Sequence, residues 1–238
     1  MIMPEYTQTL NRYSYCLNNP LMLKDPTGQK YSELDDIWDF DVNGNFIKRT
    51  ETTEFDQIRI WNKDRTRILA ESKQHPFGTF ENTMSFHEKS IIMSGIKHDL
   101  KGLEMNFGEN YEGSMIAFKF LAEHTDPTEW HAFGRSNFKG GMDNLLFTTH
   151  RADFEYFGTQ LAERAAPQGG LFYDFHSHDK NSPYFPSDKI SNGHPGDREF
   201  RYSLIGEGQS PGAIFGILQK GVMYDYRGQK MDYLKLFK

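Results

Sequence analysis

The chain has 238 residues, a formal net charge of -6, 37% hydrophobic residues and 15% aromatic residues. This length allows one large domain or two small ones with a buried core, and the aromatic content excludes a disordered chain. The acidic balance, without a basic stripe, argues against a nucleic-acid substrate. The single cysteine, Cys16, excludes an internal disulfide and a cysteine-rich metal site, so a transition metal would need His, Asp or Glu ligands.

The first stretch of the chain, from Asn11 to Gly28, contains RYSYCLNNPL and DPTG. Its Asn-Pro and Asp-Pro pairs favour a turn-rich extended chain. The stretch resembles the end of the RHS/YD-repeat core, so residues 1–28 are predicted to be the end of that core. The resemblance implies a longer secreted or surface-delivered protein whose tail is a toxin active in a target cell, with a possible immunity protein as partner.

No apolar run approaches membrane-spanning length, and the first residues do not resemble a signal peptide. We therefore expect no membrane-spanning segment. If the protein leaves its cell, another part of a larger polypeptide is expected to carry it.

Residues 29–105 are predicted to form a β-rich linking subdomain without a catalytic cluster. Strand-like residues on both sides of Asn43-Gly44 predict a hairpin with a type I′ turn. The strand pattern continues to Leu69, which favours a β meander. The pattern assigns little between residues 76 and 114.

Helical and strand-like segments alternate over the rest of the chain, which favours a mixed α/β fold. Residues 106–238 are predicted to form one domain. The expected helices are 115–124, 153–165 and 197–204, and the expected strands are 128–133, 144–148, 171–178 and 213–218.

The motif with the clearest chemistry is Phe172-Tyr173-Asp174-Phe175-His176-Ser177-His178. Residues i and i+2 of a strand point to the same face, so His176 and His178 lie side by side, as two ligands of one metal ion must. An aromatic strand that ends in two imidazoles suits a site at the edge of a sheet better than a core.

Three protein ligands and one water form a catalytic zinc site, so a third ligand is needed. Asp197 follows Pro195-Gly196 and opens a predicted helix, where it could also be a helix cap. Asp188 and His194 are alternative ligands. Asp174, on the same strand face as the histidines, could instead orient a ligand through a hydrogen bond without binding the metal itself.

The candidate general base is Glu129, on the strand predicted beside the buried helix. Such a base must reach the water that zinc activates. Partial burial beside Trp130 would raise the pKa of this carboxyl towards the working range. The alternative interpretation of Glu129 is a surface residue of the strand.

The sequences FHSH…PSD…GHPGD and FKFLAEHTDPTEWHAF together resemble the JAB/JAMM (MPN-plus) metallopeptidases and JAB-like toxins over about residues 106–228. The resemblance implies a JAB/MPN-like sheet flanked by helices and a Zn²⁺ ion. It makes Glu129 the acid/base, His176 and His178 zinc ligands, and Asp197 the third ligand.

The chain departs from the family pattern at two positions. Asp179 replaces the proline after the second histidine, and His194 stands where the family has the serine that helps to hold the oxyanion. His194 could donate to that oxyanion itself, or Ser187 or Ser191 could do so from the neighbouring loop.

The resulting hypothesis is a zinc metallopeptidase or isopeptidase that acts on a protein or peptide substrate as the C-terminal toxin of an RHS-type protein. Zinc-bound water would attack the carbonyl, with Glu129 as acid/base. A metal-dependent nuclease toxin and a non-catalytic JAB-fold binding module are the alternatives.

Overall fold

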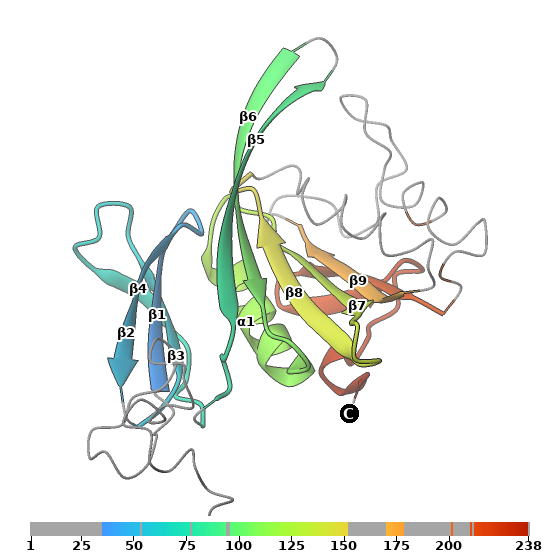
Figure 1. Cartoon of the computed structure of the whole chain (residues 1–238). Coiled ribbons are helices and arrows are strands. Elements are labelled where there is room, and N and C mark those ends of the chain that lie inside the picture. Colours follow the sequence, from blue (N-terminus) through green and yellow to red (C-terminus); the bar gives the residue numbers. More distant parts are fainter. Residues whose placement is uncertain are drawn as a thin grey trace, which may run out of the picture.

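The computed structural model describes residues 35–52, 54–76, 78–93, 96–151, 170–178, 201, 210 and 212–237. The described part of the chain forms two β-sheets (Figure 1). A four-stranded sheet has the order β2-β1-β3-β4, and a seven-stranded sheet has the order β11-β10-β9-β7-β8-β6-β5. The predicted mixed fold is therefore strand-rich in this part of the chain, where α1 is the single α-helix.

The four-stranded sheet is more complex than the predicted meander. Its strands are β1 (Asp35–Asp41), β2 (Phe46–Thr52), β3 (Gln57–Trp61) and β4 (Ile68–Glu71). Strand β1 pairs antiparallel with β2, but it pairs parallel with β3 on its other edge. The chain therefore crosses the end of β1 between β2 and β3, whereas a meander would place each strand beside the previous one.

A buried carboxylate holds this crossover in place. Asp56 is 2% exposed, and its side-chain oxygens accept hydrogen bonds from the backbone N–H groups of Asp36 (3.0 Å) and Phe80 (2.8 Å). Its own backbone exchanges two hydrogen bonds with His75. Asp56 thus joins the start of β1, the crossover and the chain that leads out of the small sheet.

The hairpin predicted at Asn43-Gly44 is confirmed, but its predicted type I′ turn is wrong. A type I′ turn needs positive φ at both central residues. Gly44 has φ +77°, whereas the described non-glycine residues with positive φ are Arg65, His150 and Lys220. The Asp41 carboxylate accepts hydrogen bonds from the N–H groups of Asn43 (2.9 Å) and Asn45 (3.0 Å) and so stabilises a different turn.

Much of the segment that the sequence left unassigned is a long hairpin of β5 (Thr83–Met93) and β6 (Ile96–Asn106). Only Leu103–Asn106 of β6 also pairs with β8 (Met142–Thr148). The outer part of the hairpin projects beyond the sheet (Figure 1). A strand pair covered by the sheet at one end only has a weak apolar pattern, which explains why the sequence did not reveal it.

The predicted helix is present as α1 (Tyr111–His124), and it begins four residues before its predicted start. The Asn110 side chain accepts a hydrogen bond from the Gly113 N–H (2.8 Å), so it supplies the N-cap and moves the start forward.

Four predicted strands are present as β7 (His131–Ser136), β8, β9 (Leu171–Ser177) and β10 (Ile214–Gln219), and β11 (Val222–Asp225) adds an edge to the sheet. Strand β7 begins three residues after its predicted start, so Glu129 precedes the strand on which it was predicted. The helix predicted over 153–165 lies outside the described residues. Of the helix predicted over 197–204, the structure describes Arg201, which is helical.

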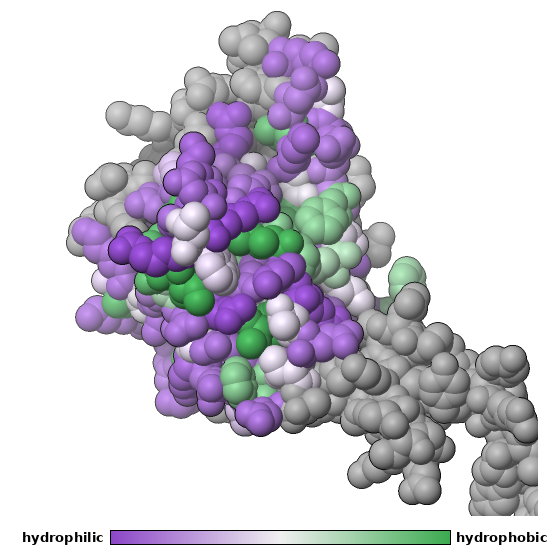
Figure 2. Space-filling view, turned by 90° about the vertical axis from the view of Figure 1, so that its left-hand side faces the viewer, coloured by the Kyte–Doolittle hydropathy of each residue, from purple (hydrophilic) through white to green (hydrophobic). Residues whose placement is uncertain are grey.

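One hydrophobic core joins both sheets and α1. It contains Phe40 and Ile60 from the small sheet, Phe118 from the helix, and Trp130 and Phe175 from the large sheet. The outer side of the small sheet is mainly hydrophilic, with small separate hydrophobic patches (Figure 2). Among the described helical residues, no helix is long and apolar enough to cross a membrane.

The crossover interaction predicts a loss of stability in Asp56→Ala. The substitution leaves two buried backbone N–H groups without their acceptor, which should lower the free energy of unfolding by about 2–5 kcal/mol. Urea unfolding measures this change. Asp64→Ala, in an exposed turn, is the control and should lie within about 0.5 kcal/mol of the parent. An equal effect of the two substitutions would contradict this role of Asp56.

Candidate metal site

The candidate site is built on the antiparallel pairing of β7 with β9. His131 lies opposite His176, and Phe133 lies opposite Asp174. Directly opposed residues of two paired strands point to the same face of the sheet. His131, Phe133, Asp174 and His176 therefore share one face.

The opposite face of these two strands belongs to the core that includes α1. Ala132 lies opposite Phe175, and both are fully buried in the core cluster with Tyr173. The two-residue period of β9 thus sends aromatic side chains to the helix and its acidic and imidazole side chains to the other face.

The structure brings His176 and His178 together, as their spacing predicted. Their Nε2 atoms are 3.1 Å apart, and both residues are half-buried. This separation suits a hydrogen bond between two neutral imidazoles. It also suits two ligands of one zinc ion, because Zn–N bonds of about 2.0–2.1 Å at a tetrahedral angle hold two nitrogens about 3.3 Å apart. The histidine pair therefore fits zinc in both donor type and spacing.

The hydrogen bonds at the end of the β7–β9 pairing involve the neighbours of Glu129 and His178. The Ser177 N–H donates to the Trp130 carbonyl (2.8 Å), and the Trp130 N–H donates to the Ser177 hydroxyl (2.9 Å). The paired register itself ends at His131 and His176. Glu129 and His178, which are both half-buried, are the next residues along the two chains after this contact.

Both backbone groups of Glu129 are held by the end of β8 and the residues that follow it. Its N–H donates to the Arg151 carbonyl (2.6 Å), and its carbonyl accepts from the Thr148 hydroxyl (2.8 Å). The backbone that carries this carboxylate is therefore anchored from two directions.

The sequence interpretation missed His131, which forms a buried pair with Asp174. His131 is 3% exposed and Asp174 is 1% exposed, and His131 Nε2 lies 2.8 Å from Asp174 Oδ1. The ring centroids of His131 and His176 are 6.4 Å apart. The pair lies beside His176, but the printed partner of Asp174 is His131, so the predicted role of Asp174 in orienting a ligand stays a prediction. A sequence signal did exist, because His131 and Glu129 are two residues apart on one strand.

The other predicted site residues lie outside the described part of the chain; they are Ser187, Asp188, Ser191, His194 and Asp197. Within the described residues, no group of three or more His, Cys, Asp or Glu side chains is arranged to hold a metal ion. The described residues thus supply two candidate ligands and a candidate base, and the third ligand stays a prediction.

Arg201 provides a link to the segment that contains the predicted third ligand. Its guanidinium carbon lies 6.0 Å from the ring centroid of Tyr226. The Tyr226 ring is in turn 6.3 Å from that of His176. The chain four residues after Asp197 therefore lies on the same side of the sheet as the histidine pair.

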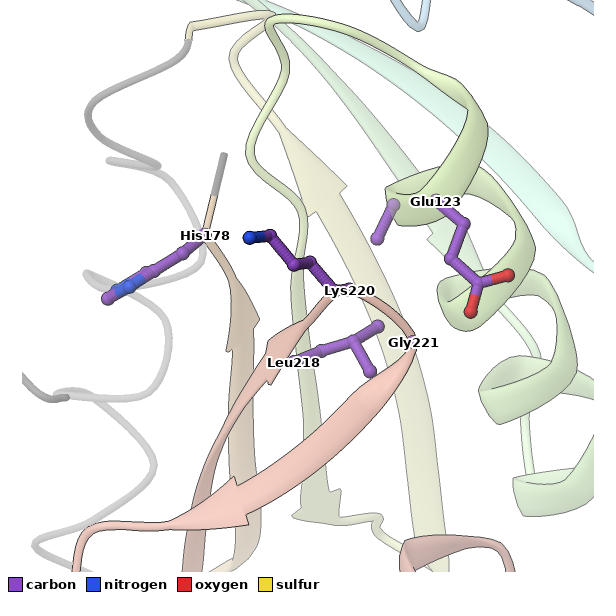
Figure 3. A pocket seen from close by; sticks show the side chains of 6 residues that line it. Glu123, His178, Leu218, Lys220 and Gly221 are labelled. Atoms are coloured by element: carbon purple, nitrogen blue, oxygen red, sulfur yellow. The ribbon is translucent and has the colours of Figure 1, made fainter. Parts of the chain in front are cut away.

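A cavity of about 350 Å³ adjoins His178 (Figure 3). Ala122 and Glu123 of α1, Leu218, and the turn residues Lys220 and Gly221 line the rest of it. In Figure 3 the Lys220 side chain extends between the end of β9 and the end of α1, away from the Glu123 carboxylate.

The charges around this cavity are partly compensated within α1. The Glu123 carboxylate lies 3.8 Å from the Lys119 ammonium. Lys220 has φ +48° and Gly221 has φ +74°, which is the pattern of a type I′ hairpin turn and fixes where the lysine leaves the backbone. The cavity therefore offers an apolar floor and an ammonium group next to a candidate metal ligand.

Comparison with known proteins gives one family. Residues 108–202 match the family model described as JAB-like toxin 1. The match begins just before α1 and includes β7, β8 and β9, so it covers Glu129, His176 and His178. It supports a JAB-like toxin domain in this part of the chain, as the sequence motifs predicted.

The small sheet and the β5–β6 hairpin precede the matched segment. No curated protein and no solved structure matches the chain. The relation of residues 1–28 to an RHS core therefore stays a prediction.

The Trp130–Ser177 contact predicts that Ser177→Ala loosens the site. The substitution removes the acceptor of a buried N–H, which should cost about 1–3 kcal/mol and increase hydrogen exchange at Trp130. Hydrogen exchange with mass spectrometry measures this locally. Ser136→Ala, an exposed serine at the other end of β7, is the control. Unchanged exchange at Trp130 in Ser177→Ala would show that the hydroxyl does not hold the strand end.

Proposed function

We propose that this chain is a zinc-dependent metallopeptidase or isopeptidase of the JAB/JAMM type that acts as a toxin. One observation carries the proposal. His176 and His178 have their Nε2 atoms 3.1 Å apart, and Glu129 lies two residues before His131, which pairs with His176. Two imidazoles and a neighbouring carboxylate are the groups that a mononuclear zinc hydrolase needs from its strands. The match to JAB-like toxin 1 supports the same class.

His176 and His178 would bind the ion, and Asp197 is the proposed third ligand. Asp188 and His194 remain the alternative third ligands. When bound, zinc polarises a carbonyl and lowers the pKa of water to about 7.

Glu129 would handle the protons of the reaction. Its carboxylate would accept a proton from the attacking water and return it to the nitrogen of the leaving amine. The anchored backbone of Glu129 would hold this group in position during both transfers. His194 and Ser187 remain the proposed donors to the oxyanion.

The proposed substrate is a protein or peptide. The cavity beside His178 has room for a side chain next to the scissile bond, and Lys220 at its wall would favour an acidic one. The formal net charge of -6 weighs against a nucleic-acid substrate.

Delivery of the domain towards target cells follows from its toxin class. We propose that it is secreted or displayed as the end of a longer RHS-type protein, on the resemblance of residues 1–28 to that family. A producing cell would then need an immunity protein, whose simplest binding surface would cover the cavity and the His178 end of β9.

The acid/base role predicts that Glu129→Gln abolishes hydrolysis but retains zinc. The amide keeps the size of the side chain and loses its basicity, so kcat should fall at least about 100-fold. Cleavage of fluorescein-labelled casein and of isopeptide-linked diubiquitin would be followed, with zinc content measured in parallel. Glu112→Gln, on the first turn of α1, is the control. Full activity of Glu129→Gln would remove Glu129 from the mechanism.

The ligand roles predict about one zinc ion per purified chain and far less in His176→Ala or His178→Ala. Plasma mass spectrometry gives the metal content, and a chelator should abolish activity that added zinc restores. His124→Ala, an exposed histidine at the end of α1, should retain the metal. Asp197→Asn and Asp188→Asn compare the two candidate third ligands. A wild-type chain with little zinc would favour a non-catalytic module.

A further inference from the structure

The tip of the β1–β2 hairpin contacts the segment that precedes Glu129 and the segment that follows β8, although both are far from it in sequence. The Thr128 hydroxyl donates to the Asn43 carbonyl (2.8 Å), and His150 Nδ1 lies 3.3 Å from the same oxygen. The Asp126 N–H donates to the Val42 carbonyl (2.8 Å). The hairpin tip therefore binds the segment that leads into Glu129 and the segment that follows β8.

These two segments are the ones that fix Glu129. Thr128 precedes it directly in the chain, and His150 precedes Arg151, whose carbonyl accepts the Glu129 N–H. The Asn43 carbonyl oxygen thus contacts both segments that hold Glu129. A displacement of this carbonyl would disturb both supports together.

Gly44 shows how closely the tip approaches the site. A Cβ atom at Gly44 would lie 3.2 Å from Thr128 Cγ2 and 3.2 Å from Trp130 Cζ2. Thr128 and Trp130 are the two sequence neighbours of Glu129. The hairpin turn therefore packs against both neighbours of the proposed base so closely that a Cβ atom would have to displace them by a few tenths of an ångström.

Aromatic residues of the hydrophobic core support the same contact. The ring of Phe40, in β1, meets the ring of Trp130 edge-on with centroids 6.3 Å apart, and both rings are fully buried. Trp130 also donates its indole N–H to the Thr125 hydroxyl (2.9 Å) and its backbone N–H to Ser177. A shift of the hairpin would thus reach the Trp130–Ser177 contact, directly after Glu129 in the chain.

We propose that the Asn43-Gly44 turn is a positioning element of the site, which sets the distance between the Glu129 carboxylate and the histidine pair. The small β-sheet, outside the segment that matches the toxin family, would then be a working part of the hydrolase. This inference rests on the proposed function for its effect on rate, but the contact itself can be tested without activity.

The chain offers a matched pair of glycines for the test. Gly44 has φ +77° and Gly78 has φ +75°, so alanine meets the same backbone strain at both positions. Only at Gly44 does the new Cβ meet neighbours, because nothing lies within 4 Å of it at Gly78. A difference between Gly44→Ala and Gly78→Ala therefore reports the contact with Thr128 and Trp130.

We expect kcat for casein or diubiquitin to fall about three- to tenfold in Gly44→Ala, because small misplacements of a catalytic group reduce the rate steeply. KM and zinc content should stay within about twofold of the parent. Thr128→Ser removes Cγ2 and keeps the hydroxyl that bonds Asn43, so adding it to Gly44→Ala should restore part of the lost kcat. Gly78→Ala should have the same kcat, KM and zinc content as the parent.

Hydrogen exchange separates this inference from the proposed function. In Gly44→Ala, exchange at Glu129 and Trp130 should rise at least about tenfold over that in Gly78→Ala, whether or not the protein hydrolyses any substrate. If the wild-type protein is inactive and exchange still rises in Gly44→Ala, the contact is supported and the hydrolase proposal is overturned. Equal exchange and equal kcat in both glycine variants would overturn the positioning role.

A second variant covers the case in which Gly44→Ala does not fold. Thr128→Val keeps the shape of the side chain and removes its hydrogen bond to Asn43. It should likewise raise exchange at Glu129 and lower kcat with zinc retained. Parent-like exchange and kcat in Thr128→Val would count against the Asn43 carbonyl as a support of Glu129.

Discussion

The pairing register of β7 with β9 is the constraint on which the candidate site depends. His131 lies opposite His176, and fully buried Ala132 lies opposite Phe175. A slip of one residue would turn Tyr173 and Phe175 away from the core and send the histidines into it. The burial of the aromatic face therefore fixes the register, and the register in turn fixes which polar groups meet. Fold stability and site geometry come from the same strand pair.

The sequence predicted the parts of the site that a short periodic pattern encodes. The two-residue period of β9 was enough to place His176 beside His178, and a run of helix-forming and apolar residues was enough to find most of α1. The buried His131–Asp174 pair joins residues 43 positions apart, which no local pattern reports. The β1–β3 pairing was missed for the same reason, because the sequence does not show on which edge of β1 the third strand lies.

The outer elements were hard to predict because tertiary contacts define them. The β5–β6 hairpin pairs with the rest of the sheet over Leu103–Asn106 only, so most of its length lacks the neighbouring strand that would help to impose an alternating pattern. The turn at Asn43-Gly44 has a strong type I′ sequence. The Asp41 carboxylate nevertheless selects another turn, since it captures two backbone N–H groups there. At this turn, the hydrogen bonds of the Asp41 side chain outweigh the preference of the Asn-Gly dipeptide for a type I′ turn.

The match to JAB-like toxin 1 begins at residue 108, but the hydrophobic core extends across that boundary. The predicted boundary between 105 and 106 falls at the end of β6, which is a strand of the same sheet as β7 and β9. Trp130 packs on Phe40 from the small sheet while its backbone N–H bonds to Ser177 beside the histidine pair. One residue therefore couples the packing of the preceding sheet to the end of the strand that carries the proposed base. In the proposed hydrolase, the segment that resembles the toxin family would supply the reactive groups, and the sheet before it would supply part of the rigidity that those groups need.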